Sequence, residues 1–255
     1  MALSKRFGKS ILILAFWLGV WQALALLVGK ELLLPDPITV LSRLAALAAS
    51  ADFWRTAAVS LGRILLGGVC GVLLGALLAA VTCRFSPVRA LLSPLLTIAR
   101  STPVASFILL VLIWVGRDIL PCVIVIVMVA PVVWANVSAG VAGTEAQLLA
   151  MARVYRFGGI KTLRLVYIPS VTPYFIAACQ TALGLSWKAG VAAEVLAVPA
   201  LSIGRRLYEA KLYLETADLF AWTVVVVLCS LALEKLLSAA LARLGRRYPG
   251  GDGNA

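Results

Sequence analysis

Long runs of hydrophobic residues, separated by short polar segments, dominate the chain. A helix needs about 20 mainly apolar residues to cross a hydrocarbon core of ~30 Å. Six stretches approach that length: residues 11–28, 64–83, 101–116, 119–140, 171–195 and 219–241. The third is the weakest because it is short and contains Pro103, so we expect it to be tilted or broken inside the bundle. The pattern predicts an all-α fold, a polytopic membrane helix bundle of about six transmembrane helices.

The composition also indicates a membrane protein. Apolar residues make up 62% of the chain and charged residues 13%, whereas soluble globular chains have roughly 45–50% and 25%. Histidine is absent, which removes zinc-protease and serine–histidine mechanisms. The five cysteines stand singly in apolar runs without a C-x-x-C pair. We interpret them as inert thiols rather than as a metal or redox site.

The distribution of basic residues predicts an orientation. The chain carries 23 basic and 11 acidic residues, a net charge of +12. In a soluble protein this excess would suggest nucleic acid as a partner, but in a membrane protein it marks cytoplasmic loops, so we expect no nucleic-acid binding. With the amino terminus inside, the inner segments hold 14 basic and three acidic residues, including Arg84, Arg89 and Arg100 before the third stretch. We therefore expect both termini in the cytoplasm.

Three connections are longer than a turn: residues 29–60 and 199–218 on the outer side, and residues 142–169 on the inner side. The first contains Leu34-Pro35-Asp36-Pro37 and then a helical pattern over residues 38–51, which predicts a helix at the outer surface. We interpret residues 1–247 as a single transmembrane domain. Residues 248–255 are expected to form a flexible tail.

Glycines recur at every fourth position in the second stretch, at Gly67, Gly71 and Gly75. Small residues on one helix face let a second helix approach closely, and little else drives helix association in lipid. We interpret these glycines as a packing face. A glycine-lined pathway is the alternative.

Charged residues at or near bilayer depth usually face a bundle interior or a watery cavity, and they indicate function. Arg63, Lys188 and Glu194 are such residues. Lys188 and Glu194 lie on different faces of one helix, so we do not expect them to pair directly. Two interpretations stay open: a structural ion pair, for which Arg63 is a candidate partner, and a polar lining near an outer gate. A Ser186/Lys188 catalytic dyad is a further alternative, although residues two apart on a helix diverge.

The inner segment from residue 150 to residue 169 mixes basic and apolar residues. Its pattern predicts a short helix, a break at Gly158 and Gly159, and a second helical stretch that carries Lys161 and Arg164 and is closed by Pro169. An exposed helix–turn–helix of this kind is suited to docking a protein. Contact with lipid headgroups is the alternative.

This segment resembles the cytoplasmic loop of inner-membrane permeases of ATP-binding-cassette (ABC) importers. Their signature is E-A-A, three residues, G, nine residues, I, one residue, then L-P. Aligned on Pro169, the third, isoleucine and leucine positions are occupied by Ala152, Val166 and Ile168. Two positions depart from the signature, because Ala150 replaces the acidic residue and Arg156 replaces the glycine.

The resemblance extends over nearly the whole chain. Other matching segments are Leu34-Pro35-Asp36-Pro37, Ser60-Leu61-Gly62-Arg63, Arg100-Ser101-Thr102-Pro103, Trp114-Val115-Gly116, Ala152-Arg153-Val154-Tyr155, and Trp187 followed by Ala193-Glu194. Together they are similar to landmarks of permeases for sulfonates, taurine, nitrate and thiamine precursors. Lys188 departs from this pattern, because the resemblance implies an apolar residue at that position.

The resemblance implies a transport subunit, not an enzyme, in a bacterial-type inner (plasma) membrane. It implies a second copy of the chain, two cytoplasmic ABC ATPases and an extracytoplasmic substrate-binding protein as partners, besides membrane lipid. ATP and Mg²⁺ would be bound by the ATPase and no cofactor by this chain. Gly8-Lys9-Ser10 lacks the earlier glycine of a phosphate-binding loop, since Leu3 stands there. The expected docking residues are Ala152, Arg153, Val154, Tyr155, Arg156, Gly158, Gly159, Lys161 and Pro169.

We predict the permease subunit of an ATP-driven importer for a small polar solute, either an organic anion such as a sulfonate or a vitamin precursor. An ion-gradient-driven secondary transporter is the alternative. Such carriers often show paired interrupted helices, whereas this sequence has one interrupted stretch. A membrane enzyme that uses Lys188 or Glu194 is a second alternative.

Overall fold

The structure, a computed structural model, describes the backbone of residues 2–245 and the side chains of residues 12–241. Every regular element in that part of the chain is helical. The elements are α1 (Ala2–Val28), α2 (Pro37–Ala48), α3 (Ala51–Arg84), α4 (Ser86–Ser101), α5 (Val104–Val111), α6 (Leu120–Ala142), α7 (Ala146–Val154), α8 (Gly159–Thr162), the π-helical segment η1 (Leu163–Tyr167), α9 (Ile168–Ala197), α10 (Ile203–Leu212) and α11 (Thr216–Gly245). The predicted all-α fold is confirmed, and the predicted tail, residues 248–255, lies outside the described residues.

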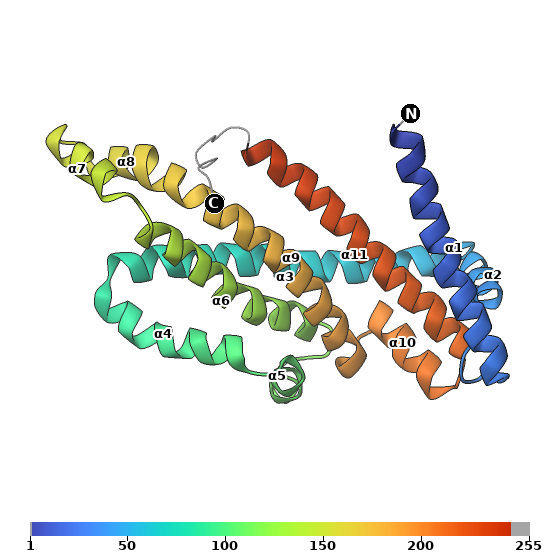
Figure 1. Cartoon of the computed structure of the whole chain (residues 1–255). Coiled ribbons are helices and arrows are strands. Elements are labelled where there is room, and N and C mark those ends of the chain that lie inside the picture. The colour runs from blue at the N-terminus through green and yellow to red at the C-terminus, as the bar shows by residue number, and fades with distance from the viewer. Residues whose placement is uncertain (1, 246–255) are drawn as a thin grey trace.

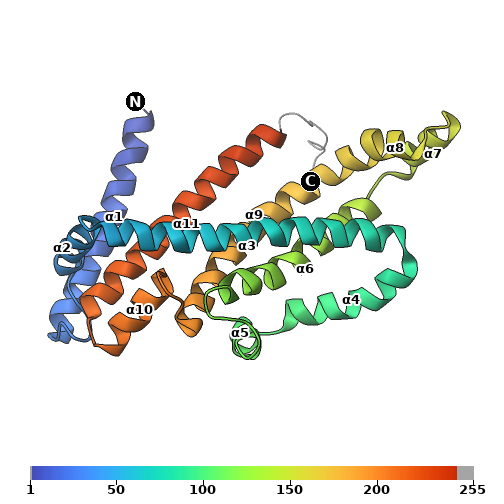
Figure 2. The same ribbon diagram turned by 180° about the vertical axis from the view of Figure 1, so that it is seen from behind.

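The helices are arranged around α3, which runs along the length of the molecule (Figures 1 and 2). α6 and α9 pack across one side of α3, and α11 lies beside α9. The connections gather at two opposite ends. We call residues 143–162 the α7 end, and residues 29–50 together with residues 198–215 the α10 end.

Three of the described helices, α3, α6 and α11, are each long and apolar enough to cross a membrane. α1 and α9 coincide with the first and fifth predicted stretches. The apolar part of α1 with described side chains runs over Leu12–Val28, and α9 has 30 residues. A polytopic helical membrane protein is therefore confirmed, whereas the side on which each terminus lies stays a prediction.

The predicted third span, residues 101–116, is wrong in its boundaries. α4 ends at Ser101, Thr102 is extended with φ −76° and ψ 133°, and α5 begins after Pro103. Proline lacks a backbone N–H and disfavours helical geometry in the residue before it, which explains the break. α5 has eight residues and is only about 12 Å long. α4 and α5 together form a pair bent by 109°, which can serve as one broken span.

The same break changes the placement of the basic residues. Arg89 and Arg100, expected in one inner loop, both belong to α4. They lie about 17 Å apart along its axis. They therefore do not form one compact cluster with Arg84, and the side of the membrane on which the three lie stays a prediction.

The glycines of α3 set its distance from α6. Gly67, Gly71 and Gly75 are buried on one face of α3. A Cβ atom at Gly75 would lie 2.5 Å from the carbonyl oxygen of Ala130, and one at Gly71 would lie 2.8 Å from the Cβ atom of Val129. Because no side chain fits into such a gap, the two backbones lie in direct contact.

Capping side chains start the two helices at the α10 end. The Asp36 carboxylate accepts a hydrogen bond from the Thr39 N–H at 2.8 Å, and Pro37 occupies the first turn of α2. Hydrogen bonds from the side chain and backbone of Thr39 lower the pKa of Asp36. Ser50 caps α3 by accepting from the Phe53 N–H at 3.2 Å. The helix predicted within residues 38–51 is confirmed as α2.

Pro169 does not close the second helical stretch, so that prediction is wrong. α8, η1 and α9 follow one another directly, and the backbone is helical from Gly159 to Ala197. A proline inside a helix supplies no N–H and crowds the preceding turn. The wider π turn of η1 comes just before Pro169 and absorbs this conflict without ending the helix.

We expect Gly75→Ala to destabilise the protein by about 1–3 kcal/mol, because overpacking forces the two backbones apart. Gly62→Ala in the same helix is the matched control, since a Cβ atom there would meet nothing within 4 Å. Thermal unfolding of both variants in one detergent, followed by tryptophan fluorescence, measures the difference. Equal melting temperatures would contradict the packing role.

Candidate functional site

A buried carboxylate near the carboxyl end of α9 organises the α10 end of the molecule. Glu194 has no exposed surface. Its Oε1 atom accepts a hydrogen bond from Arg63 Nη1 of α3 at 3.0 Å. Its Oε2 atom accepts from Ser60 Oγ at 2.9 Å and from the Gly204 N–H at 3.2 Å. Both oxygens are therefore satisfied by groups from α3 and α10.

Ser60 and Gly204 hold the start of α10 against this carboxylate. The Ser60 hydroxyl donates to Glu194 and accepts from the Ile203 N–H at 2.8 Å. A Cβ atom at position 204 would collide with the Cβ atom and backbone of Glu194. Only glycine permits this approach. We call Ser60, Arg63, Glu194 and Gly204 the α9 latch.

The turn between α9 and α10 is strained and tightly held. Val198 and Leu201 have positive φ angles of 51° and 48°, a conformation that costs roughly 1–3 kcal/mol in a residue with a side chain. Arg63 Nη2 donates to the carbonyl oxygen of Ala200 at 3.4 Å, and the Ala200 N–H donates to Asp118 at 3.0 Å. These contacts fix the turn between α3 and the segment before α6.

The latch is a structural device rather than a catalytic site. The Arg63–Glu194 contact is the ion pair that the sequence left open as one of two interpretations. Its charges neutralise each other, and both carboxylate oxygens accept hydrogen bonds. Removing one partner of such a buried pair leaves an uncompensated charge. The latch can therefore hold the α9–α10 turn in place or, when opened, release it as a unit.

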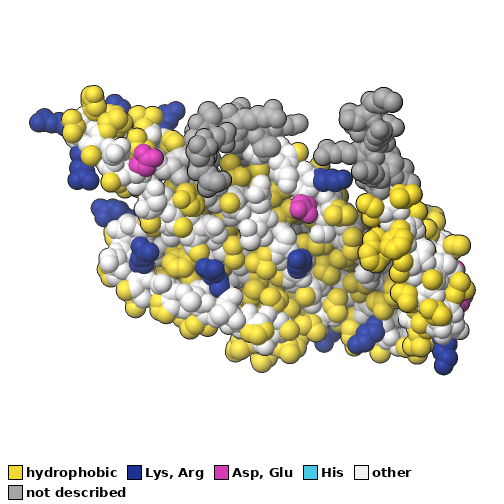
Figure 3. All heavy atoms as spheres, in the orientation of Figure 1, with side chains coloured by type: hydrophobic (Ala, Val, Ile, Leu, Met, Phe, Trp, Pro, Cys, Tyr) yellow, Lys and Arg dark blue, Asp and Glu magenta, His cyan; other side chains and the backbone are white. Residues whose placement is uncertain are grey.

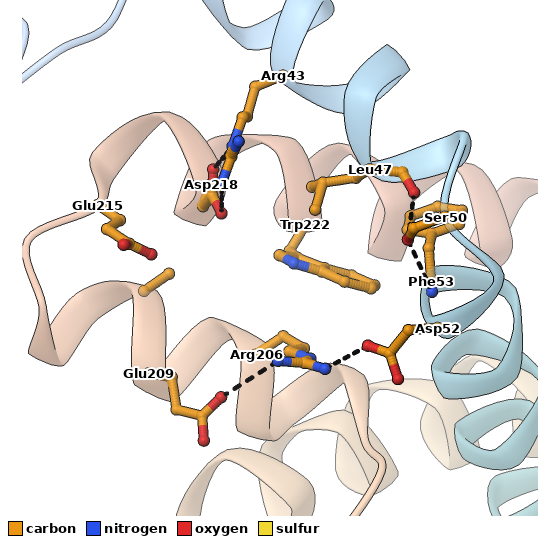
Figure 4. Close-up of a pocket in the computed structure, with 11 residues that line it drawn as sticks. Arg43, Leu47, Ser50, Asp52, Phe53, Arg206, Glu209, Glu215, Asp218 and Trp222 are labelled. Atoms are coloured by element: carbon orange, nitrogen blue, oxygen red, sulfur yellow. Dashed lines mark hydrogen bonds and ion pairs between the residues drawn. The ribbon is translucent and has the colours of Figure 1, made fainter.

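A charged cavity of about 290 Å³ lies at the same end, between α2, α3, α10 and α11 (Figure 4). Arg43 pairs with Asp218 across α2 and α11, and Arg206 pairs with Asp52 across α10 and α3. The Asp218 hydrogen bond raises the pKa of Arg43. Trp222 lies between the two pairs (Figure 4). Because both arginines are substantially exposed, each pair contributes at most about 1 kcal/mol and mainly sets how the four helices meet.

At the opposite end, Arg156 forms the turn that terminates α7. The Phe157 N–H donates to the carbonyl oxygen of Ala152 at 2.8 Å, and the Arg156 N–H donates to that of Arg153 at 3.0 Å. These two hydrogen bonds together form a Schellman motif, which needs a residue in the left-handed conformation. Arg156 is that residue, with φ 49°. Glycine adopts this conformation most readily. The permease signature has glycine at this position, so the departure at Arg156 changes the side chain and keeps the backbone shape.

The turn between α7 and α8 exposes both apolar and basic side chains. Val154, Tyr155 and Ile160 are 79%, 69% and 85% exposed. The Lys161 ammonium lies 4.3 Å from the centre of the Phe157 ring. Basic side chains gather over α7 and α8 at the upper left of Figure 3. This mixture is typical of a surface that binds another protein.

The predicted docking residues do not all lie on this surface. Arg153, Val154, Tyr155, Arg156, Gly158, Gly159 and Lys161 are exposed, whereas Ala152 is buried and Pro169 is half-buried within α9. Ala152 instead packs inward and supplies the carbonyl oxygen that closes the Schellman motif. We call residues 153–161 the docking turn, after the role that the sequence predicts for it.

Lys188 lies apart from both the latch and the docking turn. It is exposed in a groove that faces α11. Ser186 is buried and donates to the carbonyl oxygen of Ala182 at 2.6 Å. A Ser186/Lys188 catalytic dyad therefore does not form in this structure.

Gly204 is the latch residue that the sequence did not identify, and Ser60 was named only as part of the segment Ser60-Leu61-Gly62-Arg63, without a role of its own. Ser60 precedes Arg63 by three positions and shares its helix face, so the spacing was an available signal. Gly204 gave no local signal. Its role arises only because α10 folds back against Glu194.

Comparison with known proteins gives consistent results. Residues 71–248 match the family described as "Binding-protein-dependent transport system inner membrane component". The chain is 30% identical over 251 residues to the taurine transport system permease protein of Escherichia coli, covering 95% of this chain and 90% of that protein. It is 26% identical over 198 residues to the nitrate import permease protein of Leptolyngbya laminosa, covering 75% and 68%. The fold resembles that in the crystal structure of an amino acid ABC transporter with histidines, with a TM-score of 0.59 and 17% identity over 74% of this chain and 90% of that chain.

We expect Glu194→Gln to destabilise the protein by about 3–5 kcal/mol, because it leaves the half-buried Arg63 without its counter-charge. Glu209→Gln is the control: it breaks the contacts of Glu209 with Arg205 and Arg206, which are also arginine–glutamate pairs but lie at the surface. Their loss should cost at most about 1 kcal/mol. Thermal unfolding in detergent compares the two variants, and similar losses would contradict the latch.

Proposed function

Because the chain belongs to the family of binding-protein-dependent transport system inner membrane components, we propose that it is the permease subunit of an ABC-type importer for a small organic anion. Family membership makes it a multi-pass inner-membrane transport subunit and not an enzyme. Permeases of this family work with ATPase and substrate-binding partners. The observation that supports the proposal is that residues 153–161, in the segment that resembles the family's cytoplasmic loop, form an exposed turn.

The docking turn has the properties that an ATPase surface requires. Val154, Tyr155 and Ile160 offer exposed apolar area, and Arg153 and Arg156 add positive charge beside them. A partner with an apolar pocket and acidic groups would bind this turn through both kinds of contact. That partner would bind ATP and Mg²⁺, and its movement would displace the docking turn of this chain.

One helix connects the docking turn with the latch. The 39 residues from Gly159 to Ala197 are helical throughout, a length of about 58 Å. A displacement of α8 by an ATPase would be carried along this helix to Glu194 at its far end. In this mechanism the latch opens or closes the turn between α9 and α10 in response to ATP, which couples two distant sites through one rigid element.

A second copy of the chain would complete the pathway. None of the residues of α4 is buried. Leu91, Leu95 and Ile98 lie along one face of α4 and are 73%, 62% and 59% exposed. We propose that α4 and α5 of two copies pack together, so that the solute passes between the subunits.

The proposed solute is a small organic anion of the sulfonate type, with a vitamin precursor as the alternative. One relative is named for taurine transport and another for nitrate import. Taurine carries a sulfonate group and nitrate is an anion. An extracytoplasmic binding protein would deliver the solute to the α10 end, where this scheme places the outer face.

Substitutions at Arg156 separate the charge of the docking turn from its shape. We expect Arg156→Glu to uncouple ATP hydrolysis from transport, because it reverses the charge of the turn. Arg156→Gly keeps the left-handed backbone and should gain up to about 1 kcal/mol of stability while losing the charge. Lys235→Glu, exposed on α11 and outside both the docking turn and the α10 end, is the control. Unchanged uptake and unchanged substrate-stimulated hydrolysis in Arg156→Glu would contradict this role.

Native mass spectrometry of the tagged chain, purified gently from its own membranes, tests the assembly. We expect two copies together with two ATPase subunits. A lone chain, or a homo-oligomer without an ATPase across several detergents, would instead favour an ion-gradient-driven transporter. Uptake that collapses with an uncoupler at constant ATP would favour the same alternative.

A further inference from the structure

A polar groove runs between α9 and α11, away from the latch and the docking turn. Its volume is about 530 Å³. Two facing stripes supply its polar and small residues: Gln180, Gly184 and Lys188 on α9, and Ser230, Glu234 and Ser238 on α11. Within each stripe the residues are four apart, so each stripe follows one helix face. Two helices thus direct their polar positions into the same space.

The register of the two helices brings the charges of Lys188 and Glu234 toward each other. α9 and α11 are antiparallel (Figures 1 and 2), and Trp187 Nε1 donates to the carbonyl oxygen of Val226 at 3.1 Å. Lys188 follows Trp187 by one residue, and Glu234 follows Val226 by eight residues in the opposite direction. At 1.5 Å per residue, Lys188 and Glu234 therefore lie about 13 Å apart along the helix axes. Side chains lean toward the amino terminus of their helix. In antiparallel helices, these two therefore lean toward the same part of the groove.

Neither charge is paired within the described part of the chain. No ion pair within 4.0 Å and no side-chain hydrogen bond between described residues involves Lys188 or Glu234. Lys188 lies about 14 Å before the end of α9 and Glu234 about 17 Å before the end of α11, at 1.5 Å per residue. A charge this far from a helix end in a membrane protein needs water or a polar partner. The groove therefore presents an ammonium and a carboxylate with a space between them.

We propose that this groove binds a small dipolar solute that carries an acidic group at one end and an amine at the other. The acidic group would bind Lys188 and the amine would bind Glu234, with Gln180 and Ser230 as neutral hydrogen-bonding groups beside them. The volume lies within the roughly 300–1,000 Å³ of small-molecule sites. The inference rests on the proposed function in taking the chain as a permease subunit, and it adds a solute site within each subunit, apart from the pathway proposed between α4 and α5 of two copies.

The pair of opposite charges disfavours singly charged molecules. An anion at Lys188 would be repelled by Glu234, and a cation at Glu234 would be repelled by Lys188. A dipolar solute satisfies both groups at once. The groove therefore selects for charge separation within one molecule rather than for net charge.

The test is equilibrium binding to the purified full-length chain in phosphatidylglycerol nanodiscs. The probes are taurine, ethanesulfonate and ethylamine, which are similar in size but carry both charges, the negative charge alone and the positive charge alone. We expect taurine to bind at least about tenfold more tightly than the other two, since each of those lacks one charged contact.

Variants assign the binding to the groove. Lys188→Met and Glu234→Gln should each weaken taurine binding by about tenfold or more, because each removes one charge-assisted contact. Lys188→Arg keeps the charge and should bind within a few-fold of the parent. Lys211→Met, on exposed α10 outside the groove, should bind like the parent.

Several results would overturn the proposal: no saturable taurine binding, equal binding of ethanesulfonate, or unchanged binding in both Lys188→Met and Glu234→Gln. Loss of binding in phosphatidylethanolamine nanodiscs would also overturn it, because the occupant would then be a lipid headgroup. Binding to the chain alone needs neither ATPase nor binding protein. Its failure would leave the permease assignment intact, and failure to recover ATPase subunits would leave the groove intact.

Discussion

Direct backbone contact between α3 and α6 is the constraint on which the rest of the structure depends. In lipid the hydrophobic effect gives helices little reason to associate, so close packing has to supply the stability. Gly71 and Gly75 bring the backbone of α3 against α6. At Gly190 of α9, the missing side chain leaves room for the Ile64 side chain of α3. Once these three helices are fixed, the two ends of α9 have fixed positions as well.

The two ends of α9 have complementary roles. Glu194 is expensive to bury, and its cost is offset by hydrogen bonds from Arg63, Ser60 and Gly204. These same bonds hold a turn with two left-handed residues. At the other end the helix continues through a π turn into an exposed loop. A rigid helix with a strained, well-held turn at one end and an accessible surface at the other is suited to carrying motion between them.

The charged side chains of the latch and of the groove between α9 and α11 behave differently. The latch residues satisfy one another, which suits a structural role. Lys188 and Glu234 do not, although they line one groove. Because unsatisfied charge in a membrane is costly, it persists where water or a ligand meets it. The contrast between these two sets separates the groups that hold the shape of the molecule from the groups that form the proposed solute site.

The sequence by itself determined the all-helical membrane fold, the packing glycines, the exposed break near Gly158 and the family resemblance, because hydrophobic period, glycine spacing and loop motifs are local signals. It also identified Arg63, Lys188 and Glu194 as unusual charges. Only the tertiary structure decided which of them pair. Residues 60, 63, 194 and 204 meet because α10 folds back on α9, and Glu234 faces the groove of Lys188 because α11 lies antiparallel to α9. Such pairings depend on contacts between distant segments. The breaks at Pro103 and the continuity through Pro169 show the same limit, since one proline ended a helix and the other was absorbed by a π turn.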